Sequence, residues 1–247
     1  MKEFYFLCGM PRAGNTLLGS LINQNKDVKV TSNSIVPSIL SELYKLKESL
    51  TFKNFPDHVS FDNVYKNVFK NYYSSWDKSV IIERGPWGLS GNLYLLKKII
   101  KDPSFIILYR PILECLASFV NIHKPNNIEN YCNELMNKED GIIGRSLSSI
   151  NNLINSKEKY IIIHYNDIIK DPTKEIKKIF FFINLKFKKI NINKINQFSA
   201  NNVYYDDSVL SASLHKLKTN KIKKSNYSVN KILPKQIIDK YSNIDIL

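Results

Sequence analysis

Short apolar runs alternate with longer amphipathic stretches along most of the chain. Short runs rich in β-branched and aromatic residues predict buried strands, whereas apolar residues that recur every three or four positions predict helices. The predicted strands are Glu3–Cys8, Val28–Thr31, Ser79–Glu83, Phe105–Tyr109 and Tyr160–His164. The predicted helices are Asn15–Asn25, Val36–Leu50, Phe61–Trp76, Gly91–Lys101, Ile112–Ile122 and Thr173–Ile183; Lys124–Ser156 is predicted to be mostly helical, with an interruption around Gly141 and Gly144.

This alternation of strands and helices predicts an α/β fold: a three-layer sandwich with a mainly parallel central sheet flanked by helices, of the P-loop NTPase-like type. No internal repeat or linker divides the chain, so we expect a single domain over residues 1–247. Ligands of such folds bind at the carboxyl ends of the parallel strands. Residues that follow a predicted strand are therefore the first candidates for a functional site.

The segment Phe4–Ile22 reads as a strand, a tight loop and a helix, with the sequence FYFLCGMPRAGNTLLGSLI. Gly9 and Gly14 bracket four residues, which is the spacing of a phosphate-binding P-loop. The lysine that follows the second glycine in a P-loop is replaced by Asn15, and the only cation of the loop is Arg12. Backbone amides at a helix N-terminus still bind an anionic group. We therefore predict a loop that holds a phosphate which is not about to be transferred from ATP.

The run PRAGNTLL, at positions 11–18, resembles the 5′-phosphosulfate-binding loop of sulfotransferases, usually written PRSGTTLL. Ala13 replaces a serine of that pattern and Asn15 replaces a threonine. Sulfotransferases use 3′-phosphoadenosine 5′-phosphosulfate (PAPS), and the resemblance implies that its 5′-phosphosulfate is bound by Arg12, Ala13, Gly14, Asn15, Thr16 and Leu17. The alternative is a strand–turn–helix that binds nothing.

A second motif lies in Phe105–His123, where an apolar strand ends in Arg110 and a helix begins. Ser118 follows eight positions later, about two helical turns on and on roughly the same face. In sulfotransferases, an arginine at a strand end and a serine eight residues later hold the 3′-phosphate, so the resemblance assigns that role to Arg110 and Ser118. The alternative is a structural arginine paired with Glu114, one helical turn away.

A third match lies in Tyr160–Leu185, which is similar to the sulfotransferase stretch written YEDL, then DP, then a helix ending in FLG. Tyr165 follows a strand, and the resemblance implies that its ring approaches the adenine. Asn166 replaces the usual glutamate of this stretch. An ordinary strand–loop–helix without a ligand is the alternative.

Sulfuryl transfer needs positive charge near the leaving phosphate and a base for the proton of the acceptor. Arg12 is the candidate for the charge. The segment SVIIERGPW, at positions 79–87, is similar to the EK-S/T-P run of heparan-type sulfotransferases, and the resemblance makes Glu83 the catalytic base. In this chain Arg84 takes the lysine position and Gly85 the serine or threonine position. An ion pair of Glu83 with Arg84 or with Arg12 is the alternative.

Histidines are the other candidates for the base. His58 and His123 are reserve candidates, although a lone histidine at a helix end is more often a solvated cap. His164 precedes Tyr165 in a predicted strand, where a core position is expected. The sequence does not decide between Glu83 and a histidine.

The chain carries 36 basic and 22 acidic residues, a formal net charge of +14. Such an excess favours anionic partners only weakly, because much of it is lysine scattered among asparagine and isoleucine. The run Leu214–Pro234 is strongly basic, and the resemblance suggests a late loop that closes over the 3′-phosphate, with Lys218, Lys221, Lys223 and Lys224 as candidates. A solvated charged face is the alternative. Nucleic acid is not an expected partner, because aromatic residues rarely interleave with these lysines.

Three cysteines, Cys8, Cys115 and Cys132, show no disulfide or metal-binding spacing, so we expect no metal. Cys8 in a predicted strand and Cys115 in a predicted helix are expected to be small core residues. The N-terminus runs almost directly into the first strand, and no apolar run is long enough to span a bilayer. We therefore expect a cytoplasmic protein without a transmembrane segment.

The four landmarks appear in the order found in sulfotransferases and lie at predicted strand ends. The predicted function is direct in-line transfer of a sulfuryl group from PAPS to a hydroxyl or amine of an acceptor, which is a carbohydrate, a small molecule or a peptide. The alternatives are a P-loop kinase of a small metabolite and a non-catalytic nucleotide- or polyanion-binding protein. Residues Ser32–Leu50 and Pro125–Arg145 are predicted to line the acceptor side, and the oligomeric state is left open.

Overall fold

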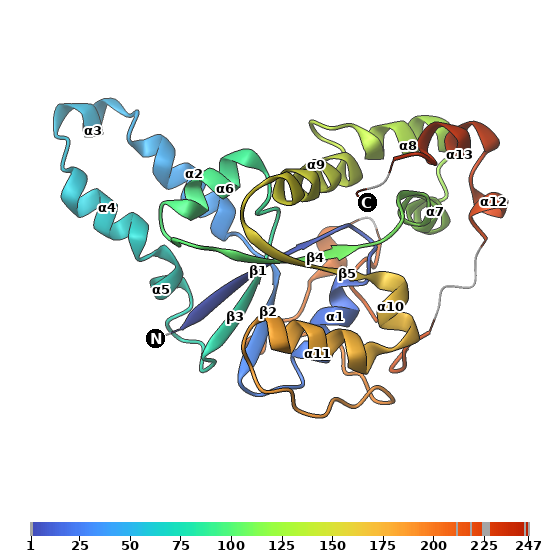
Figure 1. The fold of residues 1–247 in the computed structure, drawn as a ribbon. Coiled ribbons are helices and arrows are strands. Elements are labelled where there is room, and N and C mark those ends of the chain that lie inside the picture. Colours follow the sequence, from blue (N-terminus) through green and yellow to red (C-terminus); the bar gives the residue numbers. More distant parts are fainter. Residues whose placement is uncertain (1, 211, 218, 224–227, 245, 247) are drawn as a thin grey trace.

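A single parallel sheet forms the centre of the protein (Figure 1). The structure is a computed structural model that describes residues 2–210, 212–217, 219–223, 228–244 and 246. Within these residues the strands are β1 (Glu3–Gly9), β2 (Val28–Asn33), β3 (Val80–Arg84), β4 (Ser104–Tyr109) and β5 (Lys159–His164), in the order β2-β3-β1-β4-β5. Every pairing is parallel, so all five carboxyl ends meet at one edge of the sheet.

Helices cover both faces of this sheet. Their bounds are α1 (Asn15–Ile22), α2 (Val36–Leu46), α3 (Leu50–Asn54), α4 (His58–Lys66), α5 (Val68–Tyr72), α6 (Ser90–Lys97), α7 (Ile112–His123), α8 (Ile128–Met136), α9 (Ile142–Asn155), α10 (Tyr165–Lys170), α11 (Pro172–Phe182), α12 (Val229–Ile232) and α13 (Lys235–Tyr241), with a short 3₁₀ helix, η1, at Asp207–Val209. Figure 1 places α6 and α9 on one face and α1, α10 and α11 on the other. The predicted three-layer α/β fold is therefore confirmed.

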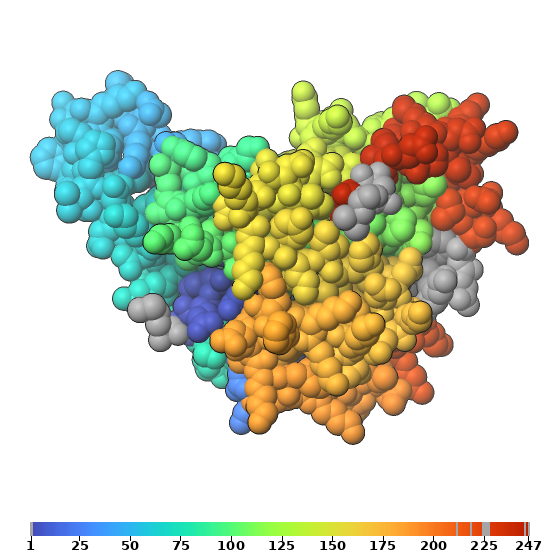
Figure 2. All heavy atoms as spheres, viewed as in Figure 1, coloured from blue at the N-terminus to red at the C-terminus, as the bar shows by residue number. Residues whose placement is uncertain are grey.

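The helices α3 and α4 project from the body of the molecule as an arm (Figures 1 and 2). Their exposed apolar side chains include Leu50, Phe55 and Val59. The space-filling view shows the arm as a separate lobe, with a hollow between it and the part of the chain around α9. The arm begins at Leu50, where the first of the two segments predicted to line the acceptor side, Ser32–Leu50, ends.

The central strands are fully apolar in their middle because helices cover them on both sides. Phe6 and Ile107 are completely buried, and the ring of Phe6 lies 5.3 Å from that of Trp87 and 5.7 Å from that of Phe105. The predicted core positions of Cys8 and Cys115 are also confirmed, and Cys132 is likewise buried and free. This packed layer holds the strand ends rigidly, which fixes the positions of the residues that follow them.

The five predicted strands are confirmed to within two residues at each end, whereas several helix predictions need correction. The segment predicted as one helix, Phe61–Trp76, contains parts of two helices, α4 and α5, because the helical conformation is interrupted at Asn67. The side-chain amide of Asn67 donates to the Asn63 carbonyl at 2.8 Å. Helix α10 was not predicted and begins directly after β5.

The predicted interruption of Lys124–Ser156 lies at residues 137–141, and Gly144 is inside α9. A Cβ atom at Gly144 would lie 2.1 Å from the carbonyl oxygen of Asn137. This glycine therefore permits a close backbone approach and does not break the helix.

In the part of the chain that the structure describes, no helix combines the length and the hydrophobicity needed to cross a bilayer.

Candidate active site

The loop between β1 and α1 is stabilised by Asn15, the residue that takes the position of the P-loop lysine. The side-chain amide of Asn15 donates to the carbonyl oxygen of Met10 at 2.7 Å, and Asn15 is 6% exposed. A Cβ atom at Gly9 would lie 1.7 Å from Oδ1 of Asn15, so only glycine fits beneath this amide. Where a P-loop lysine reaches toward a phosphate, this side chain folds back against its own loop.

Gly14 has a φ of 87°, a left-handed conformation that favours glycine. A Cβ atom here would lie 3.0 Å from the ring of Tyr165, so the ring packs directly on the loop. Ala13 is completely buried, which places its side chain in the core.

Arg12 joins three distant segments of the chain. Its Nε donates to the hydroxyl of Ser118 at 3.2 Å, and its Nη1 donates to the carbonyl oxygen of Leu214 at 2.8 Å. Its own carbonyl accepts a hydrogen bond from Nη1 of Arg110 at 2.8 Å. The φ of Arg12 is 63°, a conformation that non-glycine residues seldom adopt and that is found more often at functional sites. The phosphate loop, α7 and the C-terminal segment therefore meet at this side chain.

Arg110 is 4% exposed and has partners on two sides. Its Nε lies 3.0 Å from a carboxylate oxygen of Glu114, so the ion pair that the sequence offered as an alternative does form. Its guanidinium carbon lies 4.2 Å from the centre of the Tyr165 ring, within cation–π distance. The pair with Glu114 fixes the plane of the guanidinium without removing Arg110 from the surface of the cavity described next.

These residues surround a cavity of about 460 Å³, which we call the central cavity. Of the residues predicted from the sequence, its lining includes Arg12, Gly14, Asn15, Thr16, Leu17, Arg110, Ser118 and Tyr165. Among the described residues the lining has no aspartate or glutamate, whereas its cations are Arg12, Arg84, Arg110, Lys216, Lys221 and Lys223. Such a surface favours a ligand with more than one anionic group.

Two of the candidate lysines of the basic C-terminal run, Lys221 and Lys223, line the central cavity. Lys218 and Lys224, the other two candidates, lie outside the described residues. Within the described ranges, no group of three or more histidine, cysteine, aspartate or glutamate side chains is arranged to hold a metal ion.

Glu83 lies beneath the strand edge, and its carboxylate is completely buried. The hydroxyl of Thr31 donates to Oε2 at 2.9 Å, whereas Oε1 has no hydrogen-bond partner among the described residues. Burial raises the pKa of Glu83 to about 7, against the opposing effect of the hydroxyl groups of Ser34, Thr31 and Tyr73. Glu83 is not part of the described lining of the central cavity.

The next residue, Arg84, faces away from Glu83, because successive strand residues point to opposite faces of a sheet. Its Nη1 donates to the hydroxyl of Tyr205 at 2.6 Å, and it lines the central cavity. Arg84 also lines a smaller cavity of about 200 Å³ that includes Asn33 and Ile142. Asn33 and Ile142 come from the two segments that the sequence assigns to the acceptor side.

The three histidines considered from the sequence lie away from the described lining of the central cavity. His58 packs on Phe52 in the arm, His123 packs between aromatic rings at the end of α7, and His164 packs against Tyr109. The remaining histidine, His215, does line the cavity. No motif marks it in the sequence, because it lies in an irregular basic segment whose position depends on distant contacts.

Comparison with known proteins places this geometry in a family. Residues 3–243 match the sequence profile described as a sulfotransferase domain. Among solved structures, the fold is similar to the sulfotransferase domain from the curacin biosynthetic pathway, with 14% identity, 98% of each chain covered and a TM-score of 0.58.

It is also similar to the sulfotransferase domain from the Synechococcus PCC 7002 olefin synthase, with 13% identity over 99% of this chain and 88% of that chain and a TM-score of 0.57. A sulfotransferase from Alicyclobacillus acidocaldarius is 13% identical, over 77% of this chain and 83% of that chain, with a TM-score of 0.51. None of the curated protein sequences matches the chain. At such identities the solved structures show likeness of fold alone, but the profile extends over nearly the whole sequence. The chain therefore belongs to the sulfotransferase domain family.

Proposed function

We propose that this protein transfers a sulfuryl group from PAPS to a hydroxyl or amine group of an acceptor by direct in-line displacement. The observation that carries this proposal is the convergence of Arg12, Arg110 and Ser118 on one cavity whose described lining has no carboxylate. Asn15 supports it, because its side chain is held by the loop and does not replace the lysine of a kinase. Membership of the family is consistent with the same chemistry.

The donor nucleotide is proposed to bind through both of its phosphate positions. The backbone amides of residues 14–17, at the N-terminus of α1, and the guanidinium of Arg12 would hold the 5′-phosphosulfate. Arg110 and Ser118 would hold the 3′-phosphate, and Tyr165 would contact the adenine. Arg12 now donates to two neutral oxygens, of Ser118 and Leu214, and anionic phosphate oxygens are stronger acceptors.

In the proposed reaction the acceptor oxygen or nitrogen attacks the sulfur in line with the bond to the 5′-phosphate. The new bond to sulfur forms as the bond between sulfur and the phosphate oxygen breaks, and the nucleotide product leaves with the electron pair. Arg12 would stabilise the charge that develops on the leaving phosphate.

Glu83 stays in the proposal as the base that the sequence favours, with a histidine as the alternative. A pKa near 7 suits a general base at neutral pH, and the second carboxylate oxygen is without a hydrogen-bond partner in the described structure. The Glu83 carboxylate is completely buried and is not part of the described lining of the central cavity. To act as the base, it would therefore need an acceptor that reaches beyond this lining.

The proposal is tested by calorimetric titration with 3′-phosphoadenosine 5′-phosphate (PAP), ATP and adenosine 5′-phosphosulfate, without magnesium. We expect PAP to bind most tightly and Arg110→Ala to lose that preference. Arg145→Ala is the matched control, since this exposed arginine of α9 lies outside the cavity lining. Preference for ATP once magnesium is added would instead support the kinase alternative, and PAP binding without any transfer would support the non-catalytic one.

A further inference from the structure

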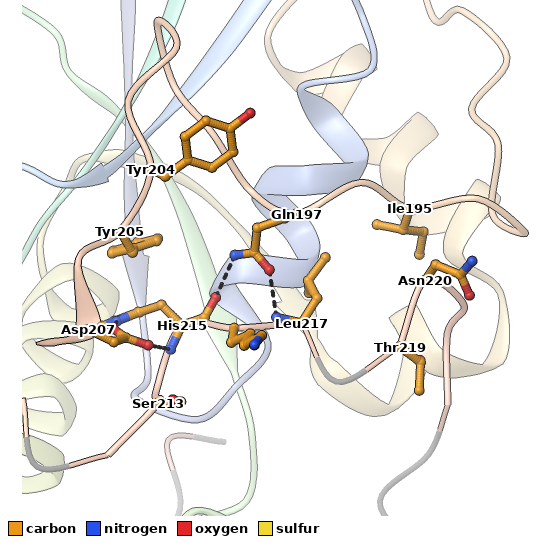
Figure 3. A pocket seen from close by; sticks show the side chains of 11 residues that line it. Ile195, Gln197, Tyr204, Tyr205, Asp207, Ser213, His215, Leu217, Thr219 and Asn220 are labelled. Carbon is orange, nitrogen blue, oxygen red and sulfur yellow. Dashed lines mark hydrogen bonds and ion pairs between the residues drawn. The ribbon is translucent and has the colours of Figure 1, made fainter.

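His215 lies on a wall between two cavities. One is the central cavity, and the other, shown in Figure 3, has a volume of about 580 Å³. The residues that line both are Ser213, His215, Lys216, Leu217 and Thr219. Each of these five residues is therefore accessible from the central cavity.

The imidazole of His215 is held at several points (Figure 3). Its Nδ1 lies 2.7 Å from Oδ1 of Asp207, and its backbone N–H donates to Oδ2 of the same carboxylate at 2.9 Å. The ring stacks on Tyr205, with centroids 4.0 Å apart and an interplanar angle of 6°. The side chain of Gln197 donates to the His215 carbonyl at 3.0 Å and accepts from the Leu217 N–H at 2.8 Å.

This arrangement selects one form of the imidazole. The carboxylate of Asp207 accepts from Nδ1, which leaves Nε2 as the ring nitrogen that can accept a proton from a ligand. Partial burial alone would raise the pKa of Asp207, but the hydrogen bonds from the backbone and ring of His215 outweigh it and lower that pKa. The carboxylate therefore stays ionised and stabilises an imidazolium that forms beside it.

The neighbours of His215 connect it to the proposed reaction centre. The carbonyl of Leu214, the preceding residue, accepts the hydrogen bond from Arg12. The hydroxyl of Tyr205, whose ring stacks on the imidazole, accepts the hydrogen bond from Arg84. Both arginines line the central cavity, so the imidazole is tied to each of them through one intermediate residue.

We propose that His215 is a catalytic residue that takes the proton of the acceptor during sulfuryl transfer, with Asp207 as its positioning residue. This inference rests on the proposed donor and transfer reaction, and it replaces Glu83 by His215 as the base, because His215 lines the central cavity and Glu83 is not part of its described lining. The acceptor O–H gives its proton to Nε2 while its oxygen bonds to sulfur, and the bond from sulfur to the 5′-phosphate breaks to release PAP. With water as the acceptor, PAPS and water give PAP and hydrogen sulfate, so the step needs no further reactant.

The test follows PAPS turnover with water as the acceptor, by separation of labelled sulfate, beside calorimetric titration with PAP. For His215→Gln we expect PAP affinity within about threefold of wild type and turnover reduced about 100-fold or more. Asp207→Asn is expected to give a smaller loss, because the ring remains but its orientation and charge partner change. Lys101→Gln, which changes an exposed side chain outside the lining of both cavities, is the control and is expected to keep wild-type turnover.

A pH profile separates a base from a residue that only supports the fold. The pH profile of turnover should differ between wild type and His215→Gln, because glutamine cannot take up the proton. Asp207 contacts the imidazole directly and Arg84 is linked to it through Tyr205, so Asp207→Asn should alter the profile less than His215→Gln does.

The outcomes distinguish the two proposals. If wild type turns over PAPS and His215→Gln does so at the same rate and with the same pH profile, the role of His215 is overturned and the sulfotransferase proposal stands. Absence of PAP binding in wild type would overturn the proposed function itself. PAP binding in wild type without release of sulfate from PAPS would overturn the proposed step from water to Nε2 of His215 and leave the nucleotide-binding part of the proposed function standing.

Discussion

Replacing Glu83 by glutamine is expected to flatten the pH dependence of folding stability. The carboxyl group is completely buried, and its pKa rises from 4.5 to about 7 on folding. A difference of about 2.5 units corresponds to about 3 kcal/mol of free energy of unfolding. Glutamine has nearly the same shape but does not ionise, so it removes this contribution and keeps the packing.

The folded state holds the Glu83 proton more tightly than the unfolded state. Below about pH 4.5 both states are protonated and the group contributes no pH dependence. As the pH rises from about 4.5 to about 7 the unfolded state ionises first, so the free energy of unfolding falls, and above pH 7 the loss is complete. Relative to wild type, Glu83→Gln should therefore gain up to about 3 kcal/mol across this range.

Urea denaturation of both proteins at a series of pH values measures this difference. Effects of all other titratable groups cancel when the two curves are subtracted. Glu175→Gln is the control. It also removes a buried carboxylate, but this carboxylate forms an ion pair, with Lys178 at 2.7 Å. Parallel curves for Glu83→Gln and wild type would refute the reasoning, because they would show that Glu83 ionises alike in the folded and unfolded states.

Three further predictions concern the loop and the nucleotide contacts. Gly9→Ala should lower the free energy of unfolding by about 1–3 kcal/mol, because its Cβ would displace the buried amide of Asn15. Gly91 has open space around it, so Gly91→Ala should not lower the free energy of unfolding in this way. Urea denaturation measures both variants. Tyr165→Ala should weaken PAP binding about tenfold or more by calorimetry, and Tyr165→Phe should retain it, if the ring stacks on adenine. Lys221→Ala should weaken PAP binding by up to about fivefold, an effect that added salt should reduce; an effect independent of salt would contradict a charge contact.

Much of the candidate site could be predicted because it follows local patterns. The apolar runs of β1 and β4 predict buried strands, and parallel strands bring the residues after their carboxyl ends to one edge. Arg12 and Arg110 follow these two neighbouring strands, and the structure joins them by a hydrogen bond of 2.8 Å. The helical spacing of Arg110 and Ser118 places both in the lining of the same cavity.

The orientation of individual side chains was not predictable in the same way. The sequence places both Asn15 and Glu83 at the edge where ligands bind. The structure holds the Asn15 amide against Met10, and it buries Glu83 beneath the edge with Thr31 as its hydrogen-bond donor. Both outcomes depend on which neighbouring atoms fill the space, and no local periodicity encodes that.

The strands, the phosphate loop and the two cationic strand ends follow from the sequence alone, because apolar runs, helix periodicity and loop spacing are patterns of a few neighbouring residues. The tertiary structure alone decided the position of His215. Its surroundings depend on contacts between residues far apart in the chain: Tyr205 comes 121 positions after Arg84, and Leu214 comes 202 positions after Arg12. Such contacts form only after the chain has folded, so an irregular segment without periodicity carries no local signal of the side chains that it will meet.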